Sequence, residues 1–207
     1  MSKLDKSTSS TDNDYEIKLK FVILGESMVG KTSIINRYIN DAFTERYLCT
    51  VGVDYQEKIV NKNNKKIKLQ LWDTAGEERY RNITKSYFKA CDGFIIAYDI
   101  NNKQSFDQVR YWVKEIASLS DTKVNCILIG TKCDLDSSER EVDEEKGNKF
   151  AQSLGYKFLE TSAKLNININ EAFDTLLDEV LLNYKPNLRE SVKLSKAQTK
   201  KQKKNCC

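Results

Sequence analysis

The chain reads Gly25-Glu26-Ser27-Met28-Val29-Gly30-Lys31-Thr32 where a strand-like run, Leu19 to Leu24, meets a helical pattern, Ser33 to Tyr38. Two glycines at this spacing let the backbone wrap round an anion, with its N–H groups pointing inward at the positive end of a helix dipole. The Lys31 ammonium then adds a point charge near the β- and γ-phosphates of a nucleotide, and the Thr32 hydroxyl can ligate Mg²⁺. The stretch therefore predicts a strand, a phosphate-binding loop and a helix that hold a nucleoside triphosphate, and it leaves the base open.

Three further motifs each follow an apolar, strand-like run. They are Trp72-Asp73-Thr74-Ala75-Gly76 after Ile67 to Leu71, Thr131-Lys132-Cys133-Asp134 after Cys126 to Ile129, and Glu160-Thr161-Ser162-Ala163-Lys164 after Lys157 to Leu159. In an open α/β sheet, ligands bind outside the carboxyl ends of the strands. Because each motif occupies such an end, we expect all of them to surround one site.

The motifs at 131–134 and 160–164 indicate guanine as the base. The Asp134 carboxylate can accept hydrogen bonds from N1–H and the 2-amino group of guanine, whereas adenine has an acceptor at N1 and no 2-amino group. The wrong base would leave this carboxylate unpaired, at a cost of roughly 1–3 kcal/mol or more. We expect the stem of Lys132 and the ring of Phe43 to pack on the two faces of the base. Backbone N–H groups near Ala163 would receive its O6 atom.

A second group of residues is expected around the γ-phosphate. Thr50 can complete the Mg²⁺ shell only while a γ-phosphate is present, and Gly76 can donate its backbone N–H to that phosphate. Asp73 supplies a carboxylate at the same end of its strand. Loss of one phosphate would therefore release two loops at once.

These motifs give the chain a clear resemblance to small GTPases of the Ras superfamily, and within them to Rab proteins, over about residues 17–184. The Rab-type signatures are Val51-Gly52-Val53-Asp54-Tyr55, Lys68-Leu69-Gln70-Leu71-Trp72-Asp73-Thr74-Ala75-Gly76, Glu78-Arg79-Tyr80-Arg81, Ser86-Tyr87-Phe88-Lys89 and Tyr98-Asp99-Ile100-Asn101. The resemblance implies an α/β fold of the P-loop NTPase type. Its six-stranded sheet would be mostly parallel, with one antiparallel strand pair and helices on both faces.

The resemblance also implies a set of site residues. Contacts to the nucleotide would come from Ser27, Met28, Val29, Gly30, Lys31, Thr32, Ser33, Phe43, Tyr47, Thr50, Gly76, Thr131, Lys132, Asp134, Ser162, Ala163 and Lys164. Thr32, Thr50 and Asp73 would hold Mg²⁺, and Lys31, Gly76 and Glu77 would act in hydrolysis.

Such proteins switch between GDP- and GTP-bound states and recruit effectors to vesicle or organelle membranes. The implied partners are an exchange factor, a GTPase-activating protein, the prenylation machinery, a GDP-dissociation inhibitor and effectors, with the chain acting as a monomer. In Rab proteins the positions of Tyr55, Trp72 and Tyr87 form an aromatic patch that effectors read, although phenylalanine is more usual where this chain has Tyr55. The alternative is that Trp72 and Tyr87 only pack locally.

Composition excludes several other classes of protein. The chain has 207 residues, enough for one sizeable α/β domain with tails. It contains no histidine, so it cannot carry a Ser-His-Asp triad or a His-based metal site. Phosphoryl transfer survives this exclusion, because positioning and electrostatics do most of its catalysis. The sequence lacks a long apolar run and an N-terminal signal pattern, so we expect synthesis in the cytosol.

The C-terminal segment is strongly basic. It contains the single acid Glu190 among Lys185, Arg189, Lys193, Lys196, Lys200, Lys201, Lys203 and Lys204. A basic tail favours an anionic membrane surface, whereas a nucleic-acid-binding protein would carry its basic surface on the folded domain. The terminal pair Cys206-Cys207 matches the doubly geranylgeranylated end of many Rab proteins, and two lipid chains suffice for stable anchoring. The alternative is a pair of exposed thiols.

Periodicity predicts the individual elements. Strands are expected at Leu19–Leu24, Val53–Val60, Ile67–Trp72, Phe94–Tyr98, Cys126–Ile129 and Lys157–Leu159, and helices at Thr32–Ile39, Ile83–Lys89, Phe106–Leu119, Glu144–Leu154 and Asn170–Leu182. The polar stretch Asn61 to Lys66 is expected to turn between two antiparallel strands. We expect a disordered extension at 1–16, the GTPase domain at 17–184 and a flexible tail at 185–207.

Three residues depart from the family pattern. Glu77 stands where most relatives place a glutamine that orients the attacking water, so we expect slow intrinsic hydrolysis. The alternative is that Glu77 is a solvated surface acid without effect on hydrolysis. Met28 replaces a small residue, so its side chain must point away from the phosphates. Thr131 replaces a commoner asparagine and retains one hydrogen bond that can brace the loop. Two functions stay open: a cycling GTPase, and a GTP-locked recruitment module that does not hydrolyse its nucleotide.

Overall fold

The computed structural model describes residues 15–45, 50, 53–75, 88, 90–118, 124–135 and 137–184. The two expected tails therefore lie outside the described residues, apart from Tyr15 and Glu16. The Glu16 N–H donates to the Lys66 carbonyl at 2.8 Å, so backbone pairing with the sheet already begins there. Of the expected helix at 83–89, only Phe88 is described.

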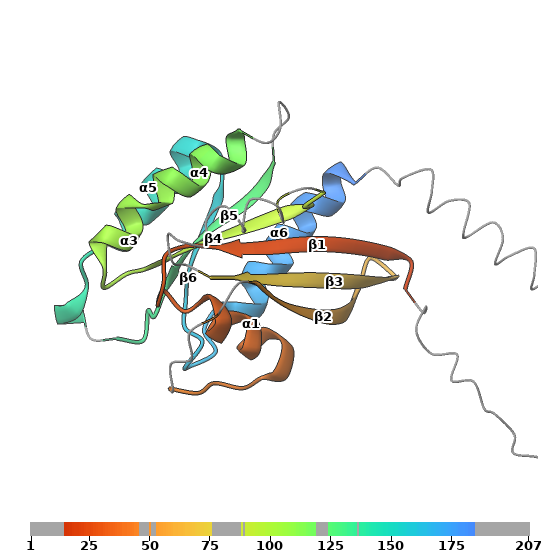
Figure 1. The fold of residues 1–207 in the computed structure, drawn as a ribbon, viewed down its shortest axis with the longest axis horizontal. Helices are drawn as coiled ribbons and strands as arrows, with labels where there is room; N and C mark the ends of the chain where they lie inside the picture. The colour runs from red at the N-terminus through yellow and green to blue at the C-terminus, as the bar shows by residue number, and fades with distance from the viewer. Residues whose placement is uncertain are drawn as a thin grey trace, which may run out of the picture.

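All six expected strands are present and form one sheet in the order β2-β3-β1-β4-β5-β6. Their bounds are Ile17–Leu24 for β1, Val53–Lys62 for β2, Lys65–Thr74 for β3, Gly93–Asp99 for β4, Asn125–Thr131 for β5 and Lys157–Thr161 for β6. Every neighbouring pair is parallel except β2 with β3. The predicted sheet is thereby confirmed, including its single antiparallel pair. The carboxyl ends of β1, β3, β4, β5 and β6 meet at one edge of the sheet, shown in Figure 1.

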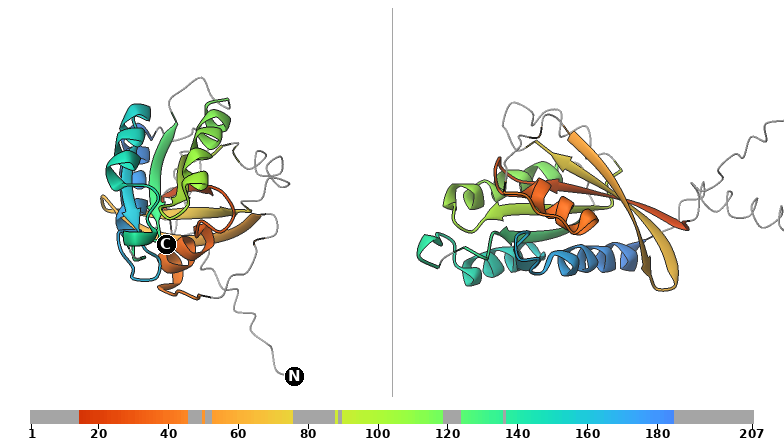
Figure 2. Two further views of the ribbon diagram at one scale, coloured as in Figure 1. Left: turned by 90° about the vertical axis from the view of Figure 1, so that its left-hand side faces the viewer. Right: turned by 90° about the horizontal axis from the view of Figure 1, so that it is seen from below.

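The hairpin between β2 and β3 is tighter than expected. Both strands extend further than the polar stretch suggested, to Lys62 and from Lys65, and only Asn63 and Asn64 form the turn. Their φ angles are 52° and 59°, which is the backbone of a two-residue turn with both central residues left-handed. Asparagine tolerates this conformation better than most residues. Figure 2 shows the hairpin twisting toward the C-terminal helix, where Lys62 Nζ lies 2.9 Å from the Asp178 carboxylate.

Helices cover both faces of the sheet, as predicted. The described helices are α1 (Lys31–Asn40), α3 (Lys103–Asp107), α4 (Val109–Ala117), α5 (Glu144–Leu154) and α6 (Ile169–Asn183), with a 3₁₀ turn at Ser137–Glu139. In Figure 1, α1 lies below the sheet, and α3, α4 and α5 lie above it. Within the described residues, no helix has the length and apolar character needed to cross a bilayer.

One expected helix, Phe106–Leu119, has different bounds. The structure begins it three residues earlier and divides it into α3 and α4 at Gln108. The earlier start has a local cause, because the Asn102 side chain accepts a hydrogen bond from the Ser105 N–H at 3.0 Å and caps α3. Apolar periodicity alone missed this cap, since the residues before Phe106 are polar.

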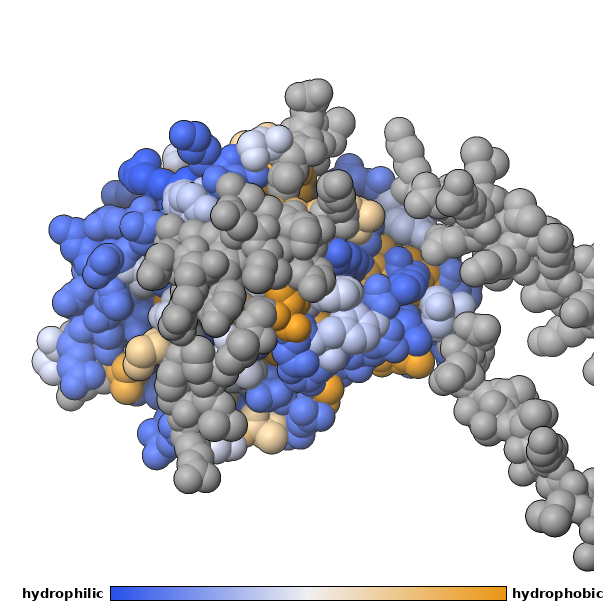
Figure 3. All heavy atoms as spheres, viewed as in Figure 1, coloured by the Kyte–Doolittle hydropathy of each residue, from blue (hydrophilic) through white to orange (hydrophobic). Residues whose placement is uncertain are grey.

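Two hydrophobic cores lie on opposite faces of the sheet. The first packs α1 and α6 against β1, β3, β4 and β5 and includes Tyr38 stacked on Phe173, with ring centroids 3.8 Å apart. The second packs α3, α4 and α5 around Trp112 and Tyr98. The outer surface seen in Figure 3 is largely hydrophilic, with apolar side chains in small separate patches. The presence of a core on each face of the sheet explains why strands such as β4 and β5 are buried on both faces.

Gly147 in α5 gives a test of this packing. A Cβ at Gly147 would lie 2.4 Å from the Tyr98 hydroxyl and 2.7 Å from the Phe158 ring, closer than real contacts allow. We expect Gly147→Ala to lower the free energy of unfolding by about 1–3 kcal/mol, despite the better helix propensity of alanine. Thermal and urea unfolding would measure the change. The exposed neighbour Asn148→Ala serves as control and should change stability by less than about 0.5 kcal/mol. Equal stability of the two variants would contradict the packing described.

Candidate nucleotide-binding site

The loop between β1 and α1 needs both of its glycines. Gly25 has a φ angle of 146°, and a Cβ there would lie 2.3 Å from the Ala97 carbonyl oxygen. Gly30 has a φ angle of 96° and directly precedes α1. Only glycine adopts such conformations without strain. The loop therefore turns sharply across the end of β4 and delivers the first N–H groups of α1 to the site, where a helix N-terminus attracts an anion.

Lys31 is held inside this loop. Its side chain is buried, and its ammonium donates to the carbonyl oxygens of Gly25 at 2.9 Å and Glu26 at 2.7 Å. These two bonds fix the charge on the inner side of the loop. A buried ammonium at the N-terminus of a helix favours a strongly anionic ligand such as a polyphosphate.

Met28 occupies the loop with a left-handed backbone, at a φ angle of 65°. Its side chain is 64% exposed, so it projects largely into solvent at the rim of the site. Met28 is also one of the residues that line the site, so the expectation that its side chain points away from the phosphates stays a prediction. A left-handed conformation costs a residue with a Cβ roughly 1–2 kcal/mol, a cost that a glycine at this position would avoid.

Three oxygen-bearing side chains meet beside Lys31. The Thr32 hydroxyl donates to Asp73 Oδ2 at 2.5 Å and lies 3.0 Å from the Thr50 hydroxyl, which is 3.4 Å from the same carboxylate oxygen. The other oxygen, Asp73 Oδ1, is buried without a hydrogen-bond partner among the described residues. Burial raises the pKa of the Asp73 carboxyl. Hydroxyl and carboxylate oxygens are the ligands that Mg²⁺ prefers, and the unpartnered oxygen fits a cation there.

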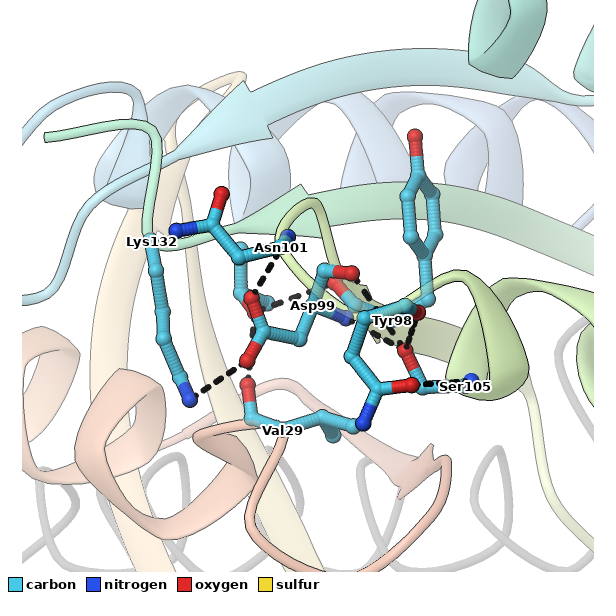
Figure 4. Close-up of polar contacts among 8 residues, drawn as sticks. Val29, Tyr98, Asp99, Asn101, Ser105 and Lys132 are labelled. Atoms are coloured by element: carbon cyan, nitrogen blue, oxygen red, sulfur yellow. Dashed lines mark hydrogen bonds and ion pairs between the residues drawn. The ribbon is translucent and has the colours of Figure 1, made fainter. Parts of the chain in front are cut away.

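The base end of the site is built from the ends of β5 and β6. Ser162 Oγ donates to Asp134 Oδ1 at 2.5 Å, which orients the carboxylate. The Thr131 hydroxyl lies 2.6 Å from the Val29 carbonyl and 3.0 Å from the Tyr98 carbonyl, so it braces the phosphate loop as expected for the residue that replaces asparagine. Figure 4 shows the Lys132 ammonium pointing at the Asp99 carboxylate, 2.6 Å away.

These groups surround one cavity of about 640 Å³. Of the predicted nucleotide contacts, those that line it are Ser27, Met28, Val29, Gly30, Lys31, Thr32, Ser33, Phe43, Thr50, Thr131, Lys132, Asp134, Ala163 and Lys164. Asp73 and Ser162 do not line the cavity; each hydrogen-bonds a residue that does. Tyr47, Gly76 and Glu77 lie outside the described residues.

Sequence reasoning missed two polar residues of the site. Asp99 pairs with Lys132, and Arg37 in α1 holds the loop that follows β6. Asp99 ends β4 beside β5, so the rule that ligands gather at strand ends could have identified it. Arg37 carries no such signal, because its partner Ala163 is 126 residues away in the sequence.

An aromatic pair lies on the sheet outside the cavity. Tyr55 and Trp72 are opposite each other on β2 and β3, with ring centroids 4.8 Å apart and planes inclined by 52°. The Lys20 ammonium lies 4.8 Å from the Trp72 ring. Burial, together with a hydrogen bond to Glu57, raises the pKa of Tyr55 to about 12, so its hydroxyl stays protonated near neutral pH. Tyr87, the third residue of the expected patch, lies outside the described residues.

Comparisons with known proteins agree with this site. The model of the Ras family matches residues 20–182. The chain is 46% identical over 169 residues to Ras-related protein Rab-3C of Bos taurus, which covers 82% of this chain and 74% of the relative. It is 44% identical over 171 residues to Ras-related protein Rab-3A of Homo sapiens, covering 83% of this chain and 77% of the relative. The chain therefore belongs to the Rab proteins of the Ras family, small GTPases that bind GTP and GDP with Mg²⁺ and act as switches in vesicle trafficking.

Proposed function

We propose that the cavity binds GTP with its phosphates on the loop before α1 and its base between β5 and β6. The observation that carries this proposal is the convergence of a phosphate loop, an oxygen-rich corner and the Asp134 carboxylate on one cavity of about 640 Å³. In this arrangement Lys31 faces the β- and γ-phosphates. Asp134, oriented by Ser162, accepts the N1–H and 2-amino protons of guanine. Lys132 and Phe43 cover the two faces of the base.

The corner formed by Thr32, Thr50 and Asp73 is the proposed magnesium site. Bound Mg²⁺ would neutralise charge on the phosphate oxygens. Thr32 sits in the first turn of α1 and is fixed by its hydrogen bond to Asp73, whereas Thr50 lies in the sequence between α1 and β2. Thr50 and Gly76 are the two residues that would respond to the γ-phosphate. Its loss would release both segments and change the surface that partners contact.

We propose that Glu77 makes intrinsic hydrolysis slow. A carboxylate accepts a hydrogen bond from water but cannot donate one, and it adds negative charge beside the γ-phosphate. GTPase-activating proteins that insert their own Arg and Gln would restore a fast reaction. The alternative of a GTP-locked recruitment module rests on Glu77 alone, while Lys31, Thr32, Thr50, Asp73 and Gly76 all remain in the sequence.

Glu77→Gln tests the role of this residue. We expect single-turnover hydrolysis of bound GTP to accelerate on the order of 10-fold or more, because the amide can both donate to and accept from the attacking water. GTP affinity should stay the same or rise, because the substitution also removes the negative charge beside the γ-phosphate. The exposed variant Glu139→Gln, on the 3₁₀ turn, is a matched control. Identical hydrolysis rates for wild type and Glu77→Gln would refute the proposal.

We propose that Cys206 and Cys207 carry geranylgeranyl groups and that the basic segment 185–207 adds attraction to anionic lipid. The prenylation machinery and a GDP-dissociation inhibitor would then be partners, besides an exchange factor and a GTPase-activating protein. The protein would attach reversibly to the cytosolic face of organelle, vesicle or plasma membranes. Effectors would contact the pair Tyr55 and Trp72 together with Tyr87.

Two experiments separate these proposals. Identifying the nucleotide that copurifies, then timing its hydrolysis with and without an activating protein, distinguishes a cycling GTPase from a GTP-locked module. We expect guanine nucleotide in the preparation and stimulated hydrolysis. Localising the full chain beside a version without Cys206 and Cys207 tests the anchor, and unchanged membrane attachment of the shortened chain would exclude it.

A further inference from the structure

The loop that follows β6 is compact and internally hydrogen-bonded. Ser162 and Ile167 exchange backbone hydrogen bonds of 3.1 Å and 2.9 Å, and the Leu165 N–H donates to Ser162 Oγ at 3.0 Å. These bonds give the loop a defined shape. They do not determine where the loop lies relative to α1, because all of them are made within the loop.

Two contacts attach the loop to other elements that line the cavity. On one side, Ser162 Oγ donates to Asp134. On the other side, Arg37 donates from Nε to the Ala163 carbonyl at 2.7 Å and from Nη2 to the Lys164 carbonyl at 3.2 Å. Arg37 therefore connects α1, which carries the phosphate loop at its start, to the two residues expected beside the guanine O6 atom.

The same guanidinium also holds the end of α1. Arg37 Nη1 donates to the Asp41 carbonyl at 2.7 Å and to the Asp41 carboxylate at 3.1 Å. Asp41 is left-handed, with a φ angle of 50°, and it precedes the cavity-lining residues Ala42 and Phe43. Asn166 Nδ2 lies 3.3 Å from the same carboxylate. Arg37 thus holds together the loop after β6 and the segment that carries Phe43.

The ion pair between Arg37 and Asp41 does not by itself hold the Arg37 side chain in this position. The Asp41 side chain is 80% exposed, so its attraction to Arg37 is largely screened by solvent. The Arg37 side chain is only 15% exposed, and its remaining bonds go to backbone carbonyls. A planar guanidinium with donors in a fixed fork can fix several carbonyls at once, which a lysine ammonium cannot do.

We propose that Arg37 is a positioning residue for recognition of the guanine 6-oxo group. By holding the Ala163 carbonyl, it fixes the peptide that carries the Lys164 N–H, and with the Lys164 carbonyl it fixes the backbone that directly follows the Ala163 N–H. These N–H groups are the ones expected to receive O6. This inference rests on the proposed binding of guanine nucleotide in the cavity. It assigns part of the base specificity to a side chain of α1 that does not itself contact the base.

The test combines Arg37 variants with a ligand that lacks the recognised atom. Dissociation constants of the full chain would be measured for GDP and for 2-aminopurine riboside diphosphate, which has the guanine 2-amino group but neither the 6-oxo group nor the proton on N1. The missing N1–H contact to Asp134 weakens the analogue equally in wild type and variant, so each variant is compared with wild type for the same ligand. For Arg37→Ala we expect GDP affinity to fall on the order of 10- to 100-fold, and analogue affinity to fall by less than about threefold. Arg37→Lys keeps the charge without the fork, so we expect it to lose most of the same selectivity for GDP.

Two controls keep the outcomes distinct. Arg110→Ala removes an exposed arginine that lies 4.7 Å from the Phe150 ring in the other core, and it should leave both affinities unchanged. Thermal unfolding with and without GDP reports whether the Arg37 variants fold. Equal losses for GDP and the analogue, or no loss for either, would overturn the positioning role. A wild-type chain that binds neither ligand would instead contradict the proposed function.

Discussion

Asp134→Asn is expected to lower the affinity for GDP by about 100-fold or more and to raise the affinity for xanthosine diphosphate. The carboxylate accepts two protons from guanine, whereas an amide NH₂ group would meet the guanine 2-amino group as a second donor. Xanthine carries an oxygen in place of that amino group, so it can accept from the new amide. Sites built on buried hydrogen bonds reject mismatched ligands by factors of about 10⁴ or more, which makes this one of the largest effects that the site allows.

Competition binding would measure the ratio of the affinities for GDP and xanthosine diphosphate in the wild type and in Asp134→Asn. Asp107→Asn is the matched control, because Asp107 is exposed at the end of α3 and the substitution removes the same charge. The control should keep the wild-type preference. A variant Asp134→Asn that still preferred guanine by the wild-type ratio would show that this carboxylate does not read the base.

Lys31→Met is expected to weaken GDP binding by about 10²- to 10³-fold. Methionine keeps most of the buried stem and removes the ammonium that Gly25 and Glu26 hold in the loop. Removing one partner of a buried, hydrogen-bonded charge pair costs on the order of 2–5 kcal/mol, much of it from the charge left behind. The substitution should weaken only the contacts with the phosphates, so a ligand without phosphates should keep its affinity.

Measuring the affinities for GDP and for guanosine tests whether the loss depends on the phosphates. The ratio of their affinities should fall sharply in Lys31→Met, because guanosine has no phosphate for Lys31 to contact. Lys103→Met, at the exposed start of α3, removes a lysine away from the cavity and should leave the ratio unchanged. If both ligands lost affinity equally in Lys31→Met, the substitution would have disturbed the whole site and Lys31 would have no specific phosphate role.

Most of the fold could be predicted because its signals are local. Strands such as β4 and β5 are short apolar runs bounded by polar residues, and this pattern indicates a strand that is buried on both faces. The first and last residues of the helices and strands were harder to predict. The cap at Asn102 and the two left-handed residues Asn63 and Asn64 depend on single side chains, so α3 and the hairpin differ from expectation by several residues at their ends.

The site could be predicted to the extent that it follows the ends of strands. Asp73, Thr131 and Asp134 each follow a recognisable strand, and parallel strands bring such ends together. The contacts that fix these residues in place could not be predicted, because the partners are far apart in sequence. Asp99 pairs with Lys132 across 33 residues, and Arg37 binds Ala163 across 126 residues. Only the packing of α1 and β4 against the later strands places these partners side by side.

Calorimetry of the purified, nucleotide-free chain with GDP and ADP, in the presence of Mg²⁺, tests the central claim most directly. The Asp134 carboxylate and the N–H groups near Ala163 predict tight binding of GDP and an affinity for ADP that is lower by at least about 100-fold. Equal affinities for the two nucleotides, or no heat of binding with either nucleotide, would contradict the claim that the cavity recognises guanine.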